Sequence, residues 1–200
     1  MSELPELYLT LDATSVSVAH LSGLLQRHPI ACVRATEPSP ETQRQQYEVN
    51  DRELVELAHA AGVPLEVTDA PDLVRPTGAD GDHVTGSALE TVDDTIGRLA
   101  HIRGQLGADA IIGVSAWPTR HDAMQLGEAN VSYLMFEPGL SRDGFSEDDL
   151  IGEVLETPLW LERLECWAKV FEIPAVAGGI TTPDEATAAA ATGAEFIEAR

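Results

Sequence analysis

The chain has 200 residues, of which 44% are hydrophobic and 23% charged, and its formal net charge is −22. This length predicts a single domain, spanning residues 1–200, with a large buried core. A surface this acidic repels nucleic-acid phosphates and anionic membranes, so we expect neither as a partner.

The first half of the chain alternates short apolar runs with helical patterns. In chain order we expect a strand at Leu7–Leu11, a helix at Val16–His28, a strand at Ile30–Ala35, a helix at Thr42–Ala61, a strand at Val63–Asp69 and a short helix within Ala70–Gly78. Gly62 follows the second helix, where a glycine commonly ends a helix.

The second half continues the same alternation. We expect a strand within Ala79–Gly86, a helix at Thr91–Gly107, a strand at Ala108–Ala116, a helix at Thr119–Ala129, a strand at Val131–Glu137, a helical region from about Ser146 to Phe171 broken near Pro158, a strand at Pro174–Gly178, a helix at Thr182–Gly193 and a strand at Glu195–Ala199. The helix at Thr91–Gly107 places Ile96, Leu99, Ile102 and Leu106 on one face, as an amphipathic helix does.

The strands are continuous apolar runs, which is typical of parallel strands covered on both faces. Eight strand–helix units, each of roughly 25 residues, are near the minimum for a βα repeat. We therefore predict an α/β protein, a (β/α)8 TIM barrel, with a doubly wound open sheet as the alternative. The chain ends two residues past Glu198, so the last helix is expected to be short or missing, unless a partner subunit of a homo-oligomer covers the last strand.

The cysteines and the first residues of the chain indicate the cellular compartment in which the protein is expected. Cys32 and Cys166 stand far apart and match no disulfide framework or metal-binding spacing. The opening stretch lacks a basic flank and an apolar signal core, and no apolar run approaches the ~20 residues that span a bilayer. We expect a cytoplasmic protein.

The active site of such a barrel lies at the carboxyl ends of its strands. The residues that follow or end the apolar runs are therefore candidates: Asp12, Arg34, Asp69, His83, Ser115, Glu137 and the pair Gly178–Gly179. Phosphate commonly binds in this fold beyond the seventh and eighth strands, through backbone N–H groups and a helix N-terminus.

The glycine pair has two interpretations. Gly178 and Gly179 stand where a strand meets a helix that begins at Thr182 and Pro183, residues suited to the N-cap and first helical positions. The pair either lets an anion approach the backbone or makes a tight turn that only glycine can make.

The other candidates are also ambiguous. Arg34 stands inside an apolar stretch. Its guanidinium could donate two parallel hydrogen bonds to a phosphate, or form an ion pair with Asp69 or Glu66. Asp69 could hold a hard cation such as Mg²⁺, or cap the following helix. His83 could act as a base or be structural. Ser115 could donate to an anion or cap a helix.

Four segments together resemble the thiamine-phosphate synthase superfamily, which includes the thiazole tautomerases. They are VTDAPDLVRPTGADGDHV, IIGVSA, IPAVAGGI and TGAEFI, in that order and spacing, and the resemblance runs from about Leu7 to the end of the chain. It implies a barrel and a reaction that joins pyrimidine methyl pyrophosphate to thiazole phosphate with Mg²⁺, releasing pyrophosphate. The substrate would be a small phosphorylated heterocycle.

The resemblance assigns roles to individual residues. It implies that Asp69 is a metal ligand and that Arg34 and Ser115 are catalytic. The residues that it places against substrate or phosphate are Arg34, Thr68, His83, Ser115, Gly178 and Gly179.

The chain also departs from the family pattern. Of the family's Gln-x-Arg-x-Lys motif only Arg34 remains, and the second metal aspartate has no match at Ala88 or Leu89. The stretch Ser141–Phe145, SRDGF, replaces the loop with the catalytic lysine, and the tautomerase histidine would fall at Pro138.

These losses predict a diverged member. Each charge-assisted hydrogen bond to phosphate is worth about 1.5–3 kcal/mol, so activity should be weakened or altered. The alternative is a non-catalytic accessory or sensor barrel that binds a thiazole or another phosphate. A third hypothesis, a phosphosugar isomerase or lyase, would need an acid–base pair such as Asp12 with Asp69 or Glu137.

Overall fold

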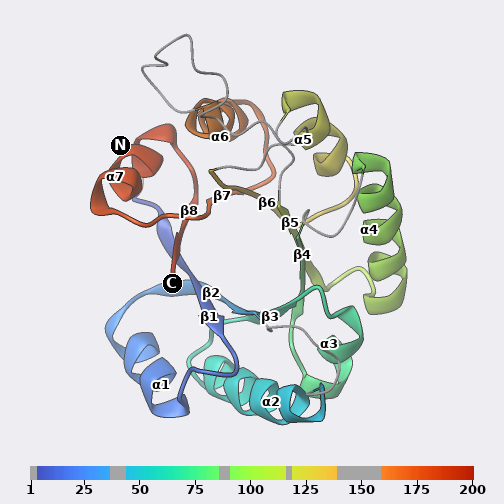
Figure 1. Ribbon diagram of the computed structural model, residues 1–200, viewed down its shortest axis with the longest axis vertical. Coiled ribbons are helices and arrows are strands. Elements are labelled where there is room, and N and C mark those ends of the chain that lie inside the picture. The colour runs from blue at the N-terminus through green and yellow to red at the C-terminus, as the bar shows by residue number, and fades with distance from the viewer. Residues whose placement is uncertain (1–3, 37–43, 86–90, 116–118, 139–158) are drawn as a thin grey trace.

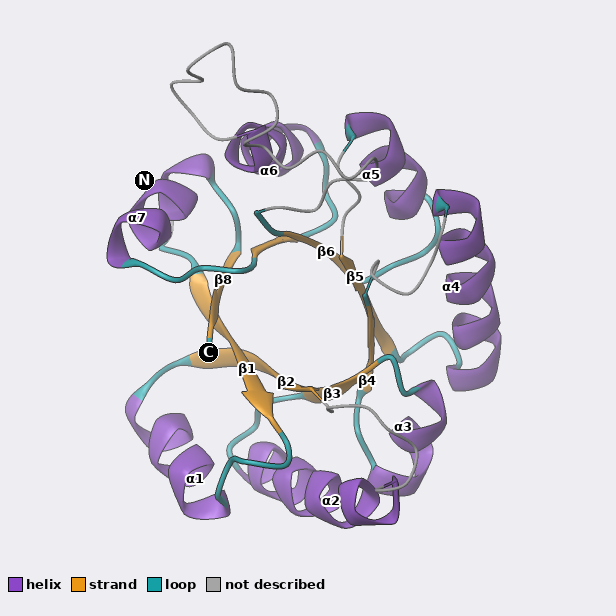
Figure 2. Cartoon of the chain, in the orientation of Figure 1, coloured by secondary structure: helices purple, strands orange, loops and turns teal. Residues whose placement is uncertain are grey.

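The computed structural model describes residues 4–36, 44–85, 91–115, 119–138 and 159–200. Eight parallel strands close into a barrel in sequence order, and Figures 1 and 2 show them as a ring inside an outer layer of helices. The strands are β1 (Glu6–Asp12), β2 (Ile30–Thr36), β3 (Leu65–Thr68), β4 (Gly81–Val84), β5 (Ile111–Ser115), β6 (Tyr133–Phe136), β7 (Ala175–Ala177) and β8 (Phe196–Ala199). The predicted (β/α)8 TIM barrel is confirmed, and the open sheet is not found.

In the part of the chain that the structure describes, seven helices connect the strands. They are α1 (Val18–Arg27), α2 (Arg44–Ala60), α3 (Pro71–Thr77), α4 (Val92–Leu106), α5 (Arg120–Gly127), α6 (Leu159–Val170) and α7 (Pro183–Thr192). Each overlaps a helix expected from the sequence, although the part of the sixth helical region before Leu159 lies outside the described residues. None of these helices is long and apolar enough to cross a membrane.

The start of α7 follows from local sequence chemistry. Thr182 is the N-cap, its side chain accepts from the Glu185 amide, and the Glu185 carboxylate accepts from the Thr182 amide in return. Pro183 occupies the first helical turn, where its missing N–H costs nothing. Gly193 ends the helix with φ 93°, a conformation that favours glycine. This cap fixes the direction of the chain just after Gly179.

The barrel interior is small and partly aromatic. Tyr8, Tyr133, Met135 and Val176 pack there, and Cys32, Ile111 and Phe196 lie against them. Two larger apolar layers separate the barrel from its helices, one around β4–β7 with α4–α7 and the other around β1–β3 with α1 and α2. These layers account for the continuous apolar runs in the sequence.

Among the described residues, β8 is the last element and is followed only by Arg200. Figure 1 shows the corresponding gap between α7 and α1. A cavity of about 810 Å³ lies on this side, and the side chains of Leu7, Leu9 and Leu11 on β1 line it together with α1 residues. The same cavity reaches Arg34 and Arg200 at the barrel mouth.

Gly113 on β5 is required by close packing in the barrel. A Cβ atom there would lie 2.0 Å from Cζ of Tyr133, whose ring fills that space. We predict that Gly113→Ala lowers the free energy of unfolding by about 1–3 kcal/mol or more, because the ring has to move. Gly104→Ala is the matched control: nothing lies within 4 Å of its new Cβ, and it should raise stability by about 0.5–1 kcal/mol. Equilibrium urea unfolding measures both, and equal stability of the two variants would contradict the packing argument.

Candidate active site at the barrel mouth

The carboxyl ends of the strands bring several predicted residues together. Arg34, Ser115 and Gly179 are linked through the side chains of Glu137, Glu198 and Arg200. Arg200, the last residue of the chain, joins the two carboxylates, with Nη2 3.2 Å from Glu137 Oε1 and 3.0 Å from Glu198 Oε2. Glu137 was expected at this rim from the sequence, whereas Glu198 and Arg200 were not expected to take part.

Glu198 is the centre of this cluster. Its Oε1 accepts hydrogen bonds from Arg34 Nη2 at 2.8 Å and Thr10 Oγ1 at 2.7 Å. Its Oε2 accepts from the Gly179 amide at 2.7 Å and from Arg200 Nε at 3.1 Å. Burial would raise the pKa of Glu198, but the bond from Thr10, the charge of Arg34 and the Gly179 amide together lower it. The carboxylate is therefore ionised and fully engaged.

Arg34 is almost as buried as its partner, with 4% of its surface exposed against 2% for Glu198. Burial lowers the pKa of Arg34, but the surrounding tyrosines and Glu198 raise it above its ordinary value, so the guanidinium stays charged. Nη1 lies 3.3 Å from the Met135 sulfur, and Nε has no hydrogen-bond partner among the described residues. The ion pair of Arg34 is thus with Glu198 and not with Asp69 or Glu66, the two partners suggested by the sequence.

The glycine pair makes the tight turn that was one of its two interpretations. Gly179 has φ 68°, the left-handed conformation of a tight turn. Its amide also holds an anion, but that anion is the Glu198 carboxylate. The Gly178 amide donates to the Phe136 carbonyl at 2.8 Å, and a Cβ at Gly178 would lie 2.7 Å from Cγ of Glu137. The space above the pair is therefore filled by side chains of the protein.

A second hydrogen-bonded chain runs from the mouth into the barrel. Ser115 Oγ lies 3.3 Å from Glu137 Oε2 and 3.1 Å from His83 Nε2. His83 Nδ1 lies 2.7 Å from the Tyr133 hydroxyl, which donates to Glu66 Oε1 at 2.9 Å. Burial, followed by the charge of Arg34, lowers the pKa of His83, so the ring is neutral. Because Tyr133 donates its proton to Glu66, its oxygen can accept from Nδ1–H, and Nε2 and Glu137 Oε2 are then alternative acceptors for the single Ser115 hydroxyl proton.

Glu66 forms the polar floor of the barrel. Its Oε1 also accepts from the Tyr8 hydroxyl at 2.7 Å and lies 3.3 Å from Cys32 Sγ. Burial raises the pKa of Glu66 although these hydrogen bonds lower it, and Oε2 has no partner in the described part of the chain. The floor therefore contains a buried carboxyl group, which the sequence suggested only as a partner for Arg34.

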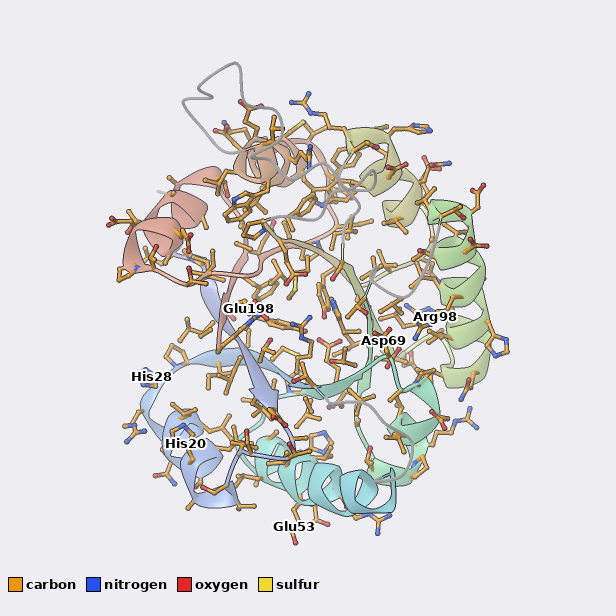
Figure 3. All side chains as sticks on the ribbon, in the orientation of Figure 1. His20, His28, Glu53, Asp69, Arg98 and Glu198 are labelled. Carbon is orange, nitrogen blue, oxygen red and sulfur yellow. The ribbon has the colours of Figure 1, made fainter. Side chains whose placement is uncertain are left out.

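Asp69 stands apart from the Glu198 cluster. Its Oδ1 lies 2.9 Å from Arg98 Nη2 and accepts from the Thr85 amide at 3.1 Å, and its Oδ2 accepts from the Thr85 hydroxyl. Figure 3 shows Asp69 next to Arg98, away from Glu198. Across the described residues there is no group of three or more His, Cys, Asp or Glu side chains able to hold a metal ion.

Of two further predicted features, only Thr68 lies within the described residues. The Thr68 hydroxyl donates to the Ala35 carbonyl at 2.9 Å, so it braces β2 against β3 beside Asp69. The stretch Ser141–Phe145, where the family has its lysine loop, lies outside the described residues. A sequence signal for Glu198 did exist: like Arg34, it is a charged residue inside a strand.

Asp82 supports the turn that carries Asp69. Its side chain is buried, Oδ1 accepts from the Ala70 amide at 2.8 Å, and Oδ2 has no partner among the described residues. Burial, with a smaller contribution from the charge of Asp69, raises the pKa of Asp82 from 3.8 to about 8, against the lowering effect of the Ala70 bond. Asp82 therefore keeps its proton near neutral pH.

The chain matches the family model described as thiamine monophosphate synthase over residues 13–199. The thiamine-phosphate synthase of Erythrobacter litoralis is 38% identical over 141 residues, covering 70% of this chain and 60% of that protein. The thiamine-phosphate synthase of Hyphomonas neptunium is 37% identical over 145 residues, covering 70% and 57%. The matched region thus spans less than two thirds of the length of these relatives.

Solved structures show the same architecture at low sequence identity. A thiamine phosphate pyrophosphorylase from Pyrococcus furiosus superimposes with a TM-score of 0.72 at 19% identity, over 97% of this chain and 84% of that one. A mutant tryptophan synthase α-subunit from the same organism gives 0.67 at 11%, over 99% and 88%. At these identities the likeness shows the barrel fold alone.

The raised pKa of Asp82 predicts a specific pH dependence. The folded protein holds a proton that the unfolded chain releases above about pH 4, so this stabilisation is lost as pH rises toward 8. Asp82→Asn keeps the acceptor for the Ala70 amide and carries no charge. Between pH 5 and 8 the wild type should lose on the order of 3 kcal/mol more stability than this variant.

Urea unfolding at several pH values measures this difference. Asp109→Asn, the same substitution in an exposed turn, is the control and should follow the wild-type profile. Parallel pH profiles for wild type and Asp82→Asn would show that Asp82 does not hold its proton.

Proposed function

Because the chain belongs to the thiamine monophosphate synthase family, we propose that it is a thiamine-phosphate synthase-like transferase of thiamine biosynthesis. It would act in the cytoplasm on small phosphorylated heterocycles. The reaction would join pyrimidine methyl pyrophosphate to thiazole phosphate and release pyrophosphate, with activity weakened or altered relative to the family.

One observation carries the proposal beyond family membership. Arg34 and the Gly179 amide point at a common anion, here the Glu198 carboxylate, at the carboxyl ends of the strands. Buried Arg and backbone N–H groups are the donors that proteins use for phosphate. Ser115 reaches the same region through Glu137, which itself pairs with Arg200.

The proposed chemistry needs charge stabilisation more than proton transfer. As the bond between the pyrimidine methylene carbon and the pyrophosphate oxygen breaks, negative charge grows on the leaving group, where Arg34 and Ser115 would donate. The thiazole nitrogen then supplies its lone pair to the carbon, and Gly178, Gly179 and Thr68 would help to position the phosphorylated partners. His83, neutral and bonded to Tyr133, would orient the Ser115 hydroxyl.

Mg²⁺ remains part of the proposal. Asp69 is the described residue that would hold it, since magnesium commonly takes one or two carboxylates together with substrate phosphates. Arg98 pairs with Asp69, so Mg²⁺ would have to replace this guanidinium beside the carboxylate. When bound, the ion would offset the charge of pyrophosphate.

The contacts of Glu198 favour one alternative, a non-catalytic barrel that binds a thiazole or another phosphate as an accessory or sensor protein. Glu198 engages two groups that a transferase of this type would direct at its substrate, Arg34 and the Gly179 amide. The same carboxylate that identifies the anion position also obstructs it. The two functions differ in turnover and not in the location of the site.

Transferase activity is tested by incubating the protein with pyrimidine methyl pyrophosphate, thiazole phosphate and Mg²⁺ and measuring product and pyrophosphate. We expect slow, enzyme-dependent formation of both, and Ser115→Ala should lower kcat/KM by about ten- to a hundredfold because one hydrogen bond to a charged group is lost. Ser22→Ala on α1 is the matched control and should leave the rate unchanged. Saturable binding of thiazole phosphate without product would favour the accessory barrel. If the protein shows no binding and forms no product, both proposed functions are ruled out.

A further inference from the structure

We propose that Glu198 is a built-in anion that occupies the phosphate position of this barrel and competes there with phosphate ligands. The inference goes beyond the proposed function, because it concerns occupancy of the corner formed by Arg34 and the Gly179 amide. It holds whether or not the protein turns over a substrate.

The donors around Glu198 are those of an anion site. Its two carboxylate oxygens receive one backbone amide, one hydroxyl and two guanidinium groups, from Gly179, Thr10, Arg34 and Arg200, at 2.7–3.1 Å. These donors come from β1, β2, the turn after β7 and the end of the chain, so they converge on one point from separate elements. A surface ion pair would require none of this convergence.

Glu198 excludes a phosphate by both space and charge. Only 2% of its surface is exposed, so no room for a second anion remains on its bonded side. Glu137 adds a second carboxylate: it packs over Gly178 and shares Arg200 with Glu198. A phosphate that approached Arg34 or the Gly179 amide with Glu198 in place would face two negative charges.

Phosphate can therefore bind only when the Glu198 side chain leaves or loses its charge. The low pKa of Glu198 makes loss of charge at neutral pH unfavourable. Side-chain departure would break the bonds from Thr10, Arg34, Arg200 and Gly179 together. Because phosphate must first displace Glu198 from these four partners, its affinity for the site is lowered by the free energy of those bonds. The barrel mouth therefore disfavours phosphorylated ligands.

A merely structural ion pair makes a different prediction. If Glu198 serves only to neutralise buried Arg34, its removal destabilises the protein and added phosphate changes nothing. If Glu198 fills a phosphate site, its removal creates a vacancy that inorganic phosphate can enter, and phosphate restores stability by mass action. Phosphate-dependent stabilisation separates the two.

The experiment compares wild type, Glu198→Ala and Glu198→Gln in inorganic phosphate at constant ionic strength, by thermal unfolding and by calorimetric titration. We expect the Tm of Glu198→Ala to be below that of the wild type without phosphate and to rise saturably with phosphate. Its Kd for phosphate should be at least about tenfold lower than that of the wild type, because charged donors become free. Glu198→Gln should fall between the two, since the amide keeps an acceptor without the charge.

Two controls locate the effect. Glu6→Ala removes an exposed carboxylate at the start of β1, at the opposite end of the barrel, and should show the wild-type phosphate response. Adding Arg34→Met to Glu198→Gln should abolish the gain, because the main cationic donor is lost. Glu198→Gln, which preserves shape, carries the test if Glu198→Ala does not fold.

The proposal is overturned if folded Glu198→Gln binds phosphate no more tightly than the wild type does. It is also overturned if the gain survives Arg34→Met. Because every readout is binding or stability, absence of transferase activity would count against the proposed function alone and leave this inference standing.

Discussion

A guanidinium buried in a barrel needs an anion beside it, because an uncompensated charge there is strongly destabilising. Arg34 lies on β2 and its anion, Glu198, on β8, with β1 between them. Thr10 of β1 donates to the same carboxylate, so one group ties three adjacent strands together. The Gly179 amide extends the tie to the turn after β7. The arrangement of the mouth depends on this one interaction.

Below the mouth, the barrel is filled with polar and aromatic groups where branched aliphatic layers are common. Tyr8, Tyr133 and His83 occupy much of the interior and lead down to Glu66. The rings fit because Gly113 leaves space beneath Tyr133. Buried hydrogen-bonded chains of this kind hold their members in fixed orientations, since each unmade bond is costly. This hydrogen-bonded chain also holds the Ser115 hydroxyl in a fixed position.

Local chemistry made the fold predictable from sequence, whereas the partners at the mouth depended on register. Apolar runs and the Thr182 cap depend on neighbouring residues, and the structure has them as expected. The partner of Arg34 was expected among Asp69 and Glu66, on the adjacent strand. Glu66 does pair in register with Arg34, but its carboxyl group bonds the tyrosines of the floor. Glu198 lies 164 residues away from Arg34, and only closure of the barrel brings them together.

The charges at the mouth explain how the departures from the family fit together. Arg34 and Arg200 face Glu137 and Glu198, so the four side-chain charges cancel inside a chain of net charge −22. A mouth with the family's additional lysines would need anions from its ligands. Here the strand-two motif keeps only its arginine, and the protein supplies the carboxylates itself. The missing cations of the strand-two motif and the two carboxylates at the mouth both act against phosphate, which is the physical basis for expecting altered chemistry on a retained barrel.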